Sequence, residues 1–183
     1  MRTTKKYTAL LAGLAVTALL LVGCKGWREF HKDFQAKDIS IDLPMIPVSG
    51  AFDFSQRSEL NFKQQIEAIK IPLITLKAFG AKEVVIELQD SISGQPVTFD
   101  VLDNLYLYIA TDSLGEELIA YKDPIPHTNS TILTMDSNVD VNLLPYAKSD
   151  HIIYRVKGVS NKATEKAVKM VVKIKWRVTA EVL

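Results

Sequence analysis

Residues 168–182, VKMVVKIKWRVTAEV, alternate apolar and polar side chains along fifteen residues. The even positions hold Val, Met, Ile, Trp and Ala, whereas the odd positions hold Lys, Arg, Thr and Glu, with Val171 as the one exception. Successive side chains of a β-strand point to opposite faces of its sheet. The period of two therefore predicts a long strand with one buried face and one solvated face.

A second alternating run lies just upstream, at residues 151–159. Its apolar side chains are Ile152, Tyr154 and Val156, and the polar segment 160–166 separates it from the C-terminal run. Two such runs joined by a short polar connection are typical of a β-hairpin. We therefore expect the two runs to pair and to bring six basic side chains onto one solvent-facing side. These are Arg155, Lys157, Lys169, Lys173, Lys175 and Arg177.

The chain upstream of the expected hairpin contains several shorter strand-like runs, separated by turns rich in Pro, Gly, Asp and Ser. A short helix is expected at about 58–69, and one or two helical turns at 139–147. No strand alternates with a long helix as a βαβ unit would need. The predicted fold class is mainly β: an antiparallel β-sandwich, immunoglobulin-like or related, with one or two short helices.

The N-terminal segment has a different character. A basic start with Arg2, Lys5 and Lys6 precedes an apolar run at 9–23, and Cys24, the only cysteine of the chain, follows directly. The run suits the apolar region of a secretory signal and is shorter than the roughly 20 residues of a membrane span. A buried core cysteine is the alternative interpretation of Cys24.

The sequence Leu21-Val22-Gly23-Cys24 resembles the lipobox of bacterial lipoproteins. The resemblance covers residues 1–24 only. It implies that the signal is removed before Cys24 and that the sulfur of Cys24 carries a diacylglycerol. The expected organisation is a signal peptide at 1–23, a lipidated tether at 24–37 and a β-sandwich domain at 38–183.

Three aromatic residues stand out in the expected tether. Trp27, Phe30 and Phe34 have helical spacing and are surrounded by basic residues. One interpretation places them on the lipid surface, with the rings at headgroup depth. The other packs the rings against the folded domain.

Charge is unevenly distributed along the chain. Without the three basic residues of the signal, 19 basic and 21 acidic residues remain, which gives no indication of a nucleic-acid partner. The segment 148–183 has nine basic and three acidic residues. The six-residue basic face is therefore the best candidate binding surface, for anionic glycan, lipid headgroups or another envelope protein. Pairing with acidic strand residues such as Glu83 and Glu87 is the alternative.

A weak calcium candidate lies at Asp136, Asn138 and Asp140, whose spacing matches the opening of calcium loops. The match fails at the sixth and twelfth positions, Val141 and Ala147. A polar loop that caps a helical turn is the simpler interpretation, so no metal site is expected.

Recognisable catalytic motifs are absent from the sequence. The three histidines lie outside any H-E-x-x-H motif, and no G-x-S-x-G elbow occurs. We therefore expect no enzyme and no cofactor, but a membrane-anchored envelope lipoprotein with a binding or structural role as adhesion, scaffold or accessory module. An envelope hydrolase acting on glycan or lipid, or a carrier of lipid or another apolar ligand, is the alternative. The expected location is the outer membrane of a Gram-negative bacterium.

Overall fold

The computed structural model describes residues 29–46, 49–58, 62–70, 76–89, 91–92, 95–149, 151–164 and 166–181. The predicted signal peptide, Cys24 and Trp27 lie outside these residues. The elements in chain order are β1 (Glu29–Gln35), β2 (Ile39–Leu43), β3 (Gly50–Ser58), α2 (Phe62–Ala68), β4 (Leu76–Leu88), β5 (Ser91–Ile92), β6 (Gln95–Pro96), η2 (Phe99–Val101), β7 (Leu102–Ala110), β8 (Glu117–Lys122), β9 (Ile132–Ser137), η3 (Tyr146–Lys148), β10 (Ile152–Ser160) and β11 (Val168–Glu181).

Nine of the strands form one antiparallel sheet in the order β1-β11-β4-β9-β8-β7-β10-β3, with β2 beside β1 on the same edge of β11. The sheet is not closed, although Gln56 of β3 donates a side-chain hydrogen bond to the Ser40 carbonyl of β2 over 2.8 Å. The mainly β, antiparallel prediction is confirmed. The nine strands form one continuous sheet, and β5 and β6 form a separate two-stranded one, so the finer expectation of a sandwich is not shown by the strand pairing.

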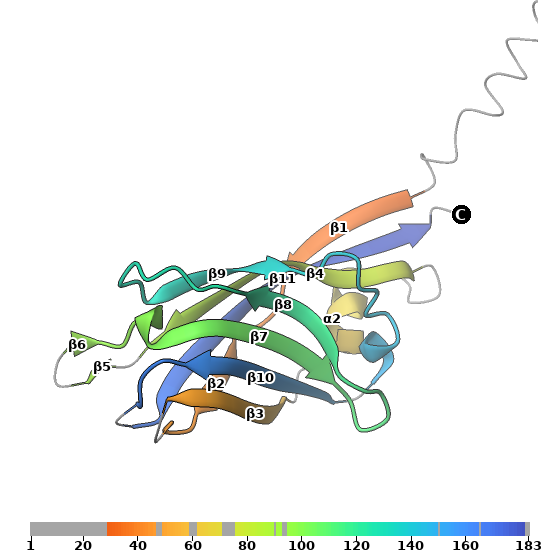
Figure 1. Cartoon of the computed structure of the whole chain (residues 1–183). Coiled ribbons are helices and arrows are strands. Elements are labelled where there is room, and N and C mark those ends of the chain that lie inside the picture. The colour runs from red at the N-terminus through yellow and green to blue at the C-terminus, as the bar shows by residue number, and fades with distance from the viewer. Residues whose placement is uncertain are drawn as a thin grey trace, which may run out of the picture.

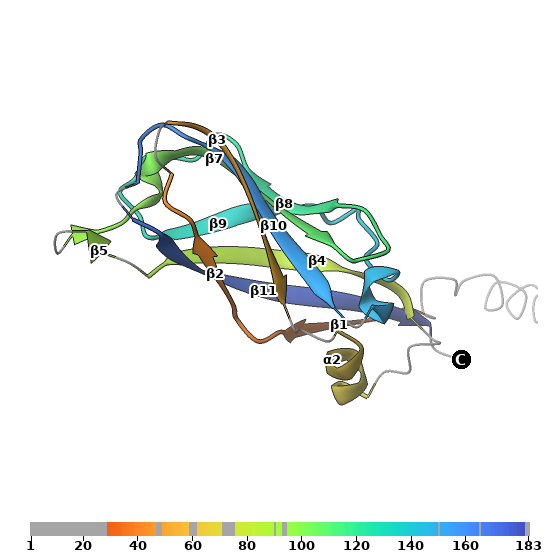
Figure 2. The same ribbon diagram turned by 90° about the horizontal axis from the view of Figure 1, so that it is seen from below.

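The sheet bends strongly where β8 meets β9, a contact of only two residue pairs. On one side of this bend lie β1, β2, β11, β4 and β9, and on the other β8, β7, β10 and β3. In Figure 1, β1, β4 and β9 lie above β7, β10 and β3, and Figure 2 shows β10 crossing obliquely over β11 and β4. The buried side chains of the two halves form one apolar core.

The C-terminal strand has the burial pattern that its sequence predicts. In β11, Met170, Val172, Trp176 and Val178 are fully buried, whereas Lys169 is exposed. The Trp176 ring contacts Phe62 of α2 and Phe79 of β4, with centroid distances of 4.8 Å and 5.0 Å. Helix α2 thus covers one end of the core, where its Phe62 and Ile66 are fully buried.

The predicted hairpin between residues 151–159 and 168–182 is wrong. Strand β10 pairs with β3 and β7, and β11 pairs with β1, β2 and β4. Alternation determines which side of a strand is buried, but it does not choose the hydrogen-bonding partner. The connection 161–167 leads the chain from one half of the sheet to the other instead of making a tight turn.

The two helix predictions differ in outcome. The helix expected at about 58–69 is present as α2, although Ser58 belongs to β3. The segment expected to be helical at 139–147 is mostly irregular and ends in η3. It covers the edge of β4 that β9 leaves free, because the Leu143 amide donates to the Phe79 carbonyl over 2.6 Å and the Phe79 amide donates to Asn142 Oδ1 over 3.2 Å.

Candidate functional site

The six predicted basic residues lie on two halves of the sheet. Arg155 and Lys157 belong to β10, and the other four belong to β11. The buried side chains of both strands point into the shared core, so the basic side chains point away from it, toward different outer surfaces. The single basic face was expected because the two strands were expected to pair. Since they do not pair, this face does not form.

The basic residues of β10 are compensated by acidic neighbours. Arg155 forms ion pairs with Asp53 of β3 and with Glu116, which precedes β8. Lys157 Nζ lies 2.6 Å from Glu116 Oε2. The hydrogen bonds from Arg155 hold the pKa of the Asp53 carboxyl below its usual value. An anionic ligand here would have to compete with carboxylates that are already in place.

On β11, the expected pairing of a basic side chain with an acidic strand residue is present at Glu87. Lys173 Nζ lies 2.7 Å from Glu87 Oε2 of β4, and the hydrogen bond that Lys173 donates to Glu87 raises the pKa of Lys173. Arg177 pairs with Asp33 of β1. Lys175 lines a shallow hollow together with Lys173 and Glu83.

The expected tether continues into the sheet. Residues 29–35 form β1, which pairs along its whole length with β11, from Glu29 opposite Glu181 to Gln35 opposite Lys175. The helical spacing was misleading here, since a short isolated helix is only marginally stable in water, whereas pairing with β11 lets Phe34 pack against the core. Phe34 stacks on Phe79 at a centroid distance of 6.3 Å, so this ring packs on the folded domain. Phe30 is 46% exposed.

The weak calcium candidate does not converge on a common point. Asp136 pairs with Lys122, whose Nζ lies 3.2 Å from each carboxylate oxygen. The Asn138 side chain donates to the Leu118 carbonyl over 3.2 Å, and Asp140 lies in an exposed loop. In the described part of the chain, no group of three or more His, Cys, Asp or Glu side chains could hold a metal ion.

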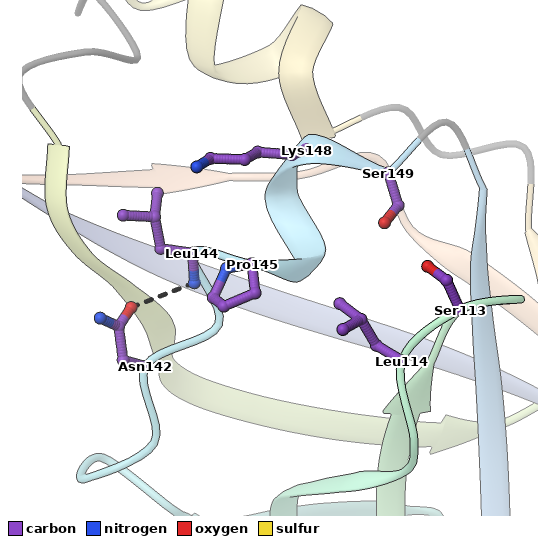
Figure 3. Close-up of a pocket in the computed structure, with 7 residues that line it drawn as sticks. All are labelled: Ser113, Leu114, Asn142, Leu144, Pro145, Lys148 and Ser149. Atoms are coloured by element: carbon purple, nitrogen blue, oxygen red, sulfur yellow. Dashed lines mark hydrogen bonds between the residues drawn. The ribbon is translucent and has the colours of Figure 1, made fainter.

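A shallow hollow of about 470 Å³ lies between the β7–β8 turn and the segment around η3. Figure 3 shows Ser113 and Leu114 on the turn, across from Pro145 and Ser149. Its described lining residues include Lys148 as the one ionisable side chain, and no His, Asp, Glu or Cys is among them. A largely apolar hollow beside Leu43, Leu88 and Val168 has a volume of only about 20 Å³, too small for a lipid chain.

A more polar hollow lies on the outer surface of β3, β10 and β7. Its volume is about 490 Å³, and its lining includes Asp53, Asn104, Tyr106, Tyr108 and Lys157. The Lys157 ammonium lies 4.7 Å from the centre of the Tyr108 ring, a cation–π distance. Lys157, a residue of the predicted basic face, thus meets the half-buried ring of Tyr108 here.

Sequence reasoning passed over the two tyrosines. In LYLYIA at 105–110, Leu105, Leu107 and Ile109 occupy every second position, and all three are fully buried. The same alternation places Tyr106 and Tyr108 on the outer face. The missing information was which strands flank β7, and therefore which charged residues surround the rings.

In the described residues no helix is long and apolar enough to span a membrane. No protein-family model matches the chain, and no curated protein matches it.

Proposed function

We propose that this chain is a lipid-anchored protein of the bacterial cell envelope, with a non-catalytic binding or structural role. The observation that carries the proposal is the sequence of residues 1–24, in which a basic start and an apolar run lead to a lipobox-like segment and the only cysteine. The proposed lipid is a diacylglycerol on Cys24, and the proposed location is the outer membrane of a Gram-negative bacterium.

The fold supports a short anchor. Strand β1 begins at Glu29, five residues after Cys24, so the lipid attachment lies within about 17 Å of the sheet at about 3.4 Å per extended residue. Figure 1 shows the start of β1 beside the C-terminal end of β11, at one end of the molecule. In the proposed arrangement this end faces the bilayer, and the exposed Phe30 ring would contact the headgroup layer.

The same arrangement leaves the outer surface of β3, β10 and β7 free. These strands form the half of the sheet opposite to β1 and β11 (Figure 1). We further propose that the two halves act as the layers of a sandwich that share one core and are joined through β8 and β9. Such a domain would present one layer toward binding partners while the other holds the anchored strand.

The test is metabolic labelling of cells that produce the full chain, using an alkyne-tagged fatty acid. We expect labelled protein in the outer-membrane fraction for the natural sequence and for Lys25→Ala as a matched control. Cys24→Ala should be unlabelled and should keep the mass of the uncleaved chain. Normal labelling or normal processing of Cys24→Ala would refute the anchor.

A further inference from the structure

Three tyrosines adjoin one another on the outer surface of the β3-β10-β7-β8 half. Tyr106 and Tyr108 are two residues apart on β7 and therefore share a face. Tyr121 of β8 lies directly opposite Tyr106 and is 39% exposed. We call Tyr106, Tyr108 and Tyr121, with the hollow beside them, the tyrosine face.

Two of these rings are held in place by charged neighbours. The Tyr106 hydroxyl donates to Asp123, and this hydrogen bond raises the pKa of Tyr106. The Tyr108 ring lies below the Lys157 ammonium, which is itself fixed by Glu116. Rings that are already ordered lose little conformational entropy when a ligand stacks on them.

The three basic side chains around the tyrosine face, Arg57, Arg155 and Lys157, are each paired with a carboxylate. Arg155 and Lys157 share Glu116, and Arg57 Nη2 lies 2.5 Å from Asp112. The formal charge is close to neutral, with a net of −1. The residues counted are the acidic Asp53, Asp112, Glu116 and Asp123 and the basic Arg57, Arg155 and Lys157. A charged ligand gains little here, because each cation that it could approach already has a carboxylate partner.

The hollow also offers polar groups at fixed positions. Asp53 and Lys157 line it from two neighbouring strands. Asn104 lines it from β7, and its Oδ1 is buried with no hydrogen-bond partner in the described structure. A hydroxyl donor that reached this oxygen would remove the cost of leaving it unpaired.

We propose that the tyrosine face binds a neutral oligosaccharide. A sugar ring presents an apolar C–H face that stacks on aromatic rings, and its hydroxyls both donate to carboxylates and accept from ammonium and amide groups. It carries no charge, which fits the paired ions. The proposal deepens and rests on the proposed binding role at the envelope, since it names the ligand class of a surface turned away from the anchor.

The experiment is affinity electrophoresis of the full chain in mild detergent. The gels contain glycogen, yeast mannan or laminarin as neutral polysaccharides, or alginate as an anionic one. We expect at least one neutral polysaccharide to retard the protein, with little change when salt is raised. Retardation by none of the three neutral polysaccharides, or by alginate alone, would overturn the proposal.

Variants assign the binding to the tyrosine face. Tyr108→Ala should weaken retardation about threefold to tenfold, the range expected for the loss of one aromatic contact. Tyr108→Phe, which keeps the ring, and Phe30→Ala, which removes an exposed ring on β1, should bind like the natural chain. Equal binding by Tyr108→Ala, with its fold verified by thermal melting, would place the ligand elsewhere and overturn the assignment.

Binding and anchoring can fail separately. Cys24→Ala should be retarded like the natural chain although it is not lipidated. Retardation without lipidation of the natural chain would refute only the anchor, and lipidation without retardation would refute only the glycan site.

Discussion

Arg177 of β11 donates two hydrogen bonds to Asp33 of β1, from Nε to Oδ1 over 2.7 Å and from Nη2 to Oδ2 over 3.1 Å. Lys82 of β4 donates to the same carboxylate over 2.5 Å. One side chain of the expected tether thus accepts from two strands of the sheet. Arg177, which the sequence analysis assigned to a binding face, therefore helps to hold β1 against the sheet.

Replacing Asp33 with Asn should make stability depend less on pH. Arg177 and Lys82 lower the pKa of Asp33 well below its usual value, so the carboxylate stabilises the fold above its unfolded pKa of about 4. This contribution is lost as pH falls through the lower folded-state pKa. The variant should be less stable by about 1 kcal/mol or less at pH 7, since the partners are partly exposed.

Urea unfolding at pH 7 and at successively lower pH measures this difference, which should shrink below about pH 4. Asp140→Asn, in an exposed loop, is the control and should change stability little at any pH. A difference between the natural chain and Asp33→Asn that grows on acidification would contradict the ion-pair account.

Trp176→Ala should be among the most destabilising single substitutions. The ring is fully buried and contacts Phe62 and Phe79, so its removal leaves a cavity where α2, β4 and β11 meet. The expected cost is about 3–5 kcal/mol in the free energy of unfolding. Phe30→Ala, at an exposed aromatic position, should change it by less than about 0.5 kcal/mol. Similar costs for both variants in urea titrations would show that the core is placed wrongly.

Tyr154→Phe should leave stability unchanged or increase it. Tyr154 is 1% exposed, and its hydroxyl has no hydrogen-bond partner in the described structure. Burial also raises the pKa of Tyr154 far above its usual value. Removing an unpaired buried hydroxyl relieves a desolvation cost of about 1–3 kcal/mol. A clear loss of stability on thermal melting would mean that the hydroxyl has a partner, such as a buried water.

Gly158→Ala should destabilise the sheet by about 1–3 kcal/mol. A Cβ at this position would lie 2.5 Å from the Asn104 carbonyl oxygen and 2.8 Å from Phe52 Cζ, so backbone must move. Gly115→Ala is the matched control, because no atom lies within 4 Å of its added Cβ. Equal thermal melting of both variants and the natural chain would refute this close approach.

Millimolar calcium should leave the thermal melt unchanged. Asp136 is paired with Lys122, and Asn138 donates to a backbone carbonyl. Binding would require breaking these contacts to assemble oxygen ligands. A rise of several degrees in the melting temperature with calcium, but not with magnesium, would restore the metal site.

Alternation in the sequence was sufficient for the mainly β class and for the orientation of individual strands. It placed Trp176, Val172 and Met170 inside and Lys169 and Arg177 outside. These properties are local, because a strand with one apolar side must bury that side whatever its neighbours are. Helix α2 buries one side through a different spacing, since Phe62 and Ile66 are four residues apart and share one helix face.

Pairing was decided only by the tertiary structure. The sequence offered β10 as the nearest partner of β11, yet β11 pairs with β4 and with the two N-terminal strands, which are separated from it by more than 120 residues. Local periodicity has no information about such distant contacts, since a strand edge accepts any backbone in the correct register. The same limit explains why Phe34 was expected in a tether, and why the neighbours of Tyr108 became visible only in the folded sheet.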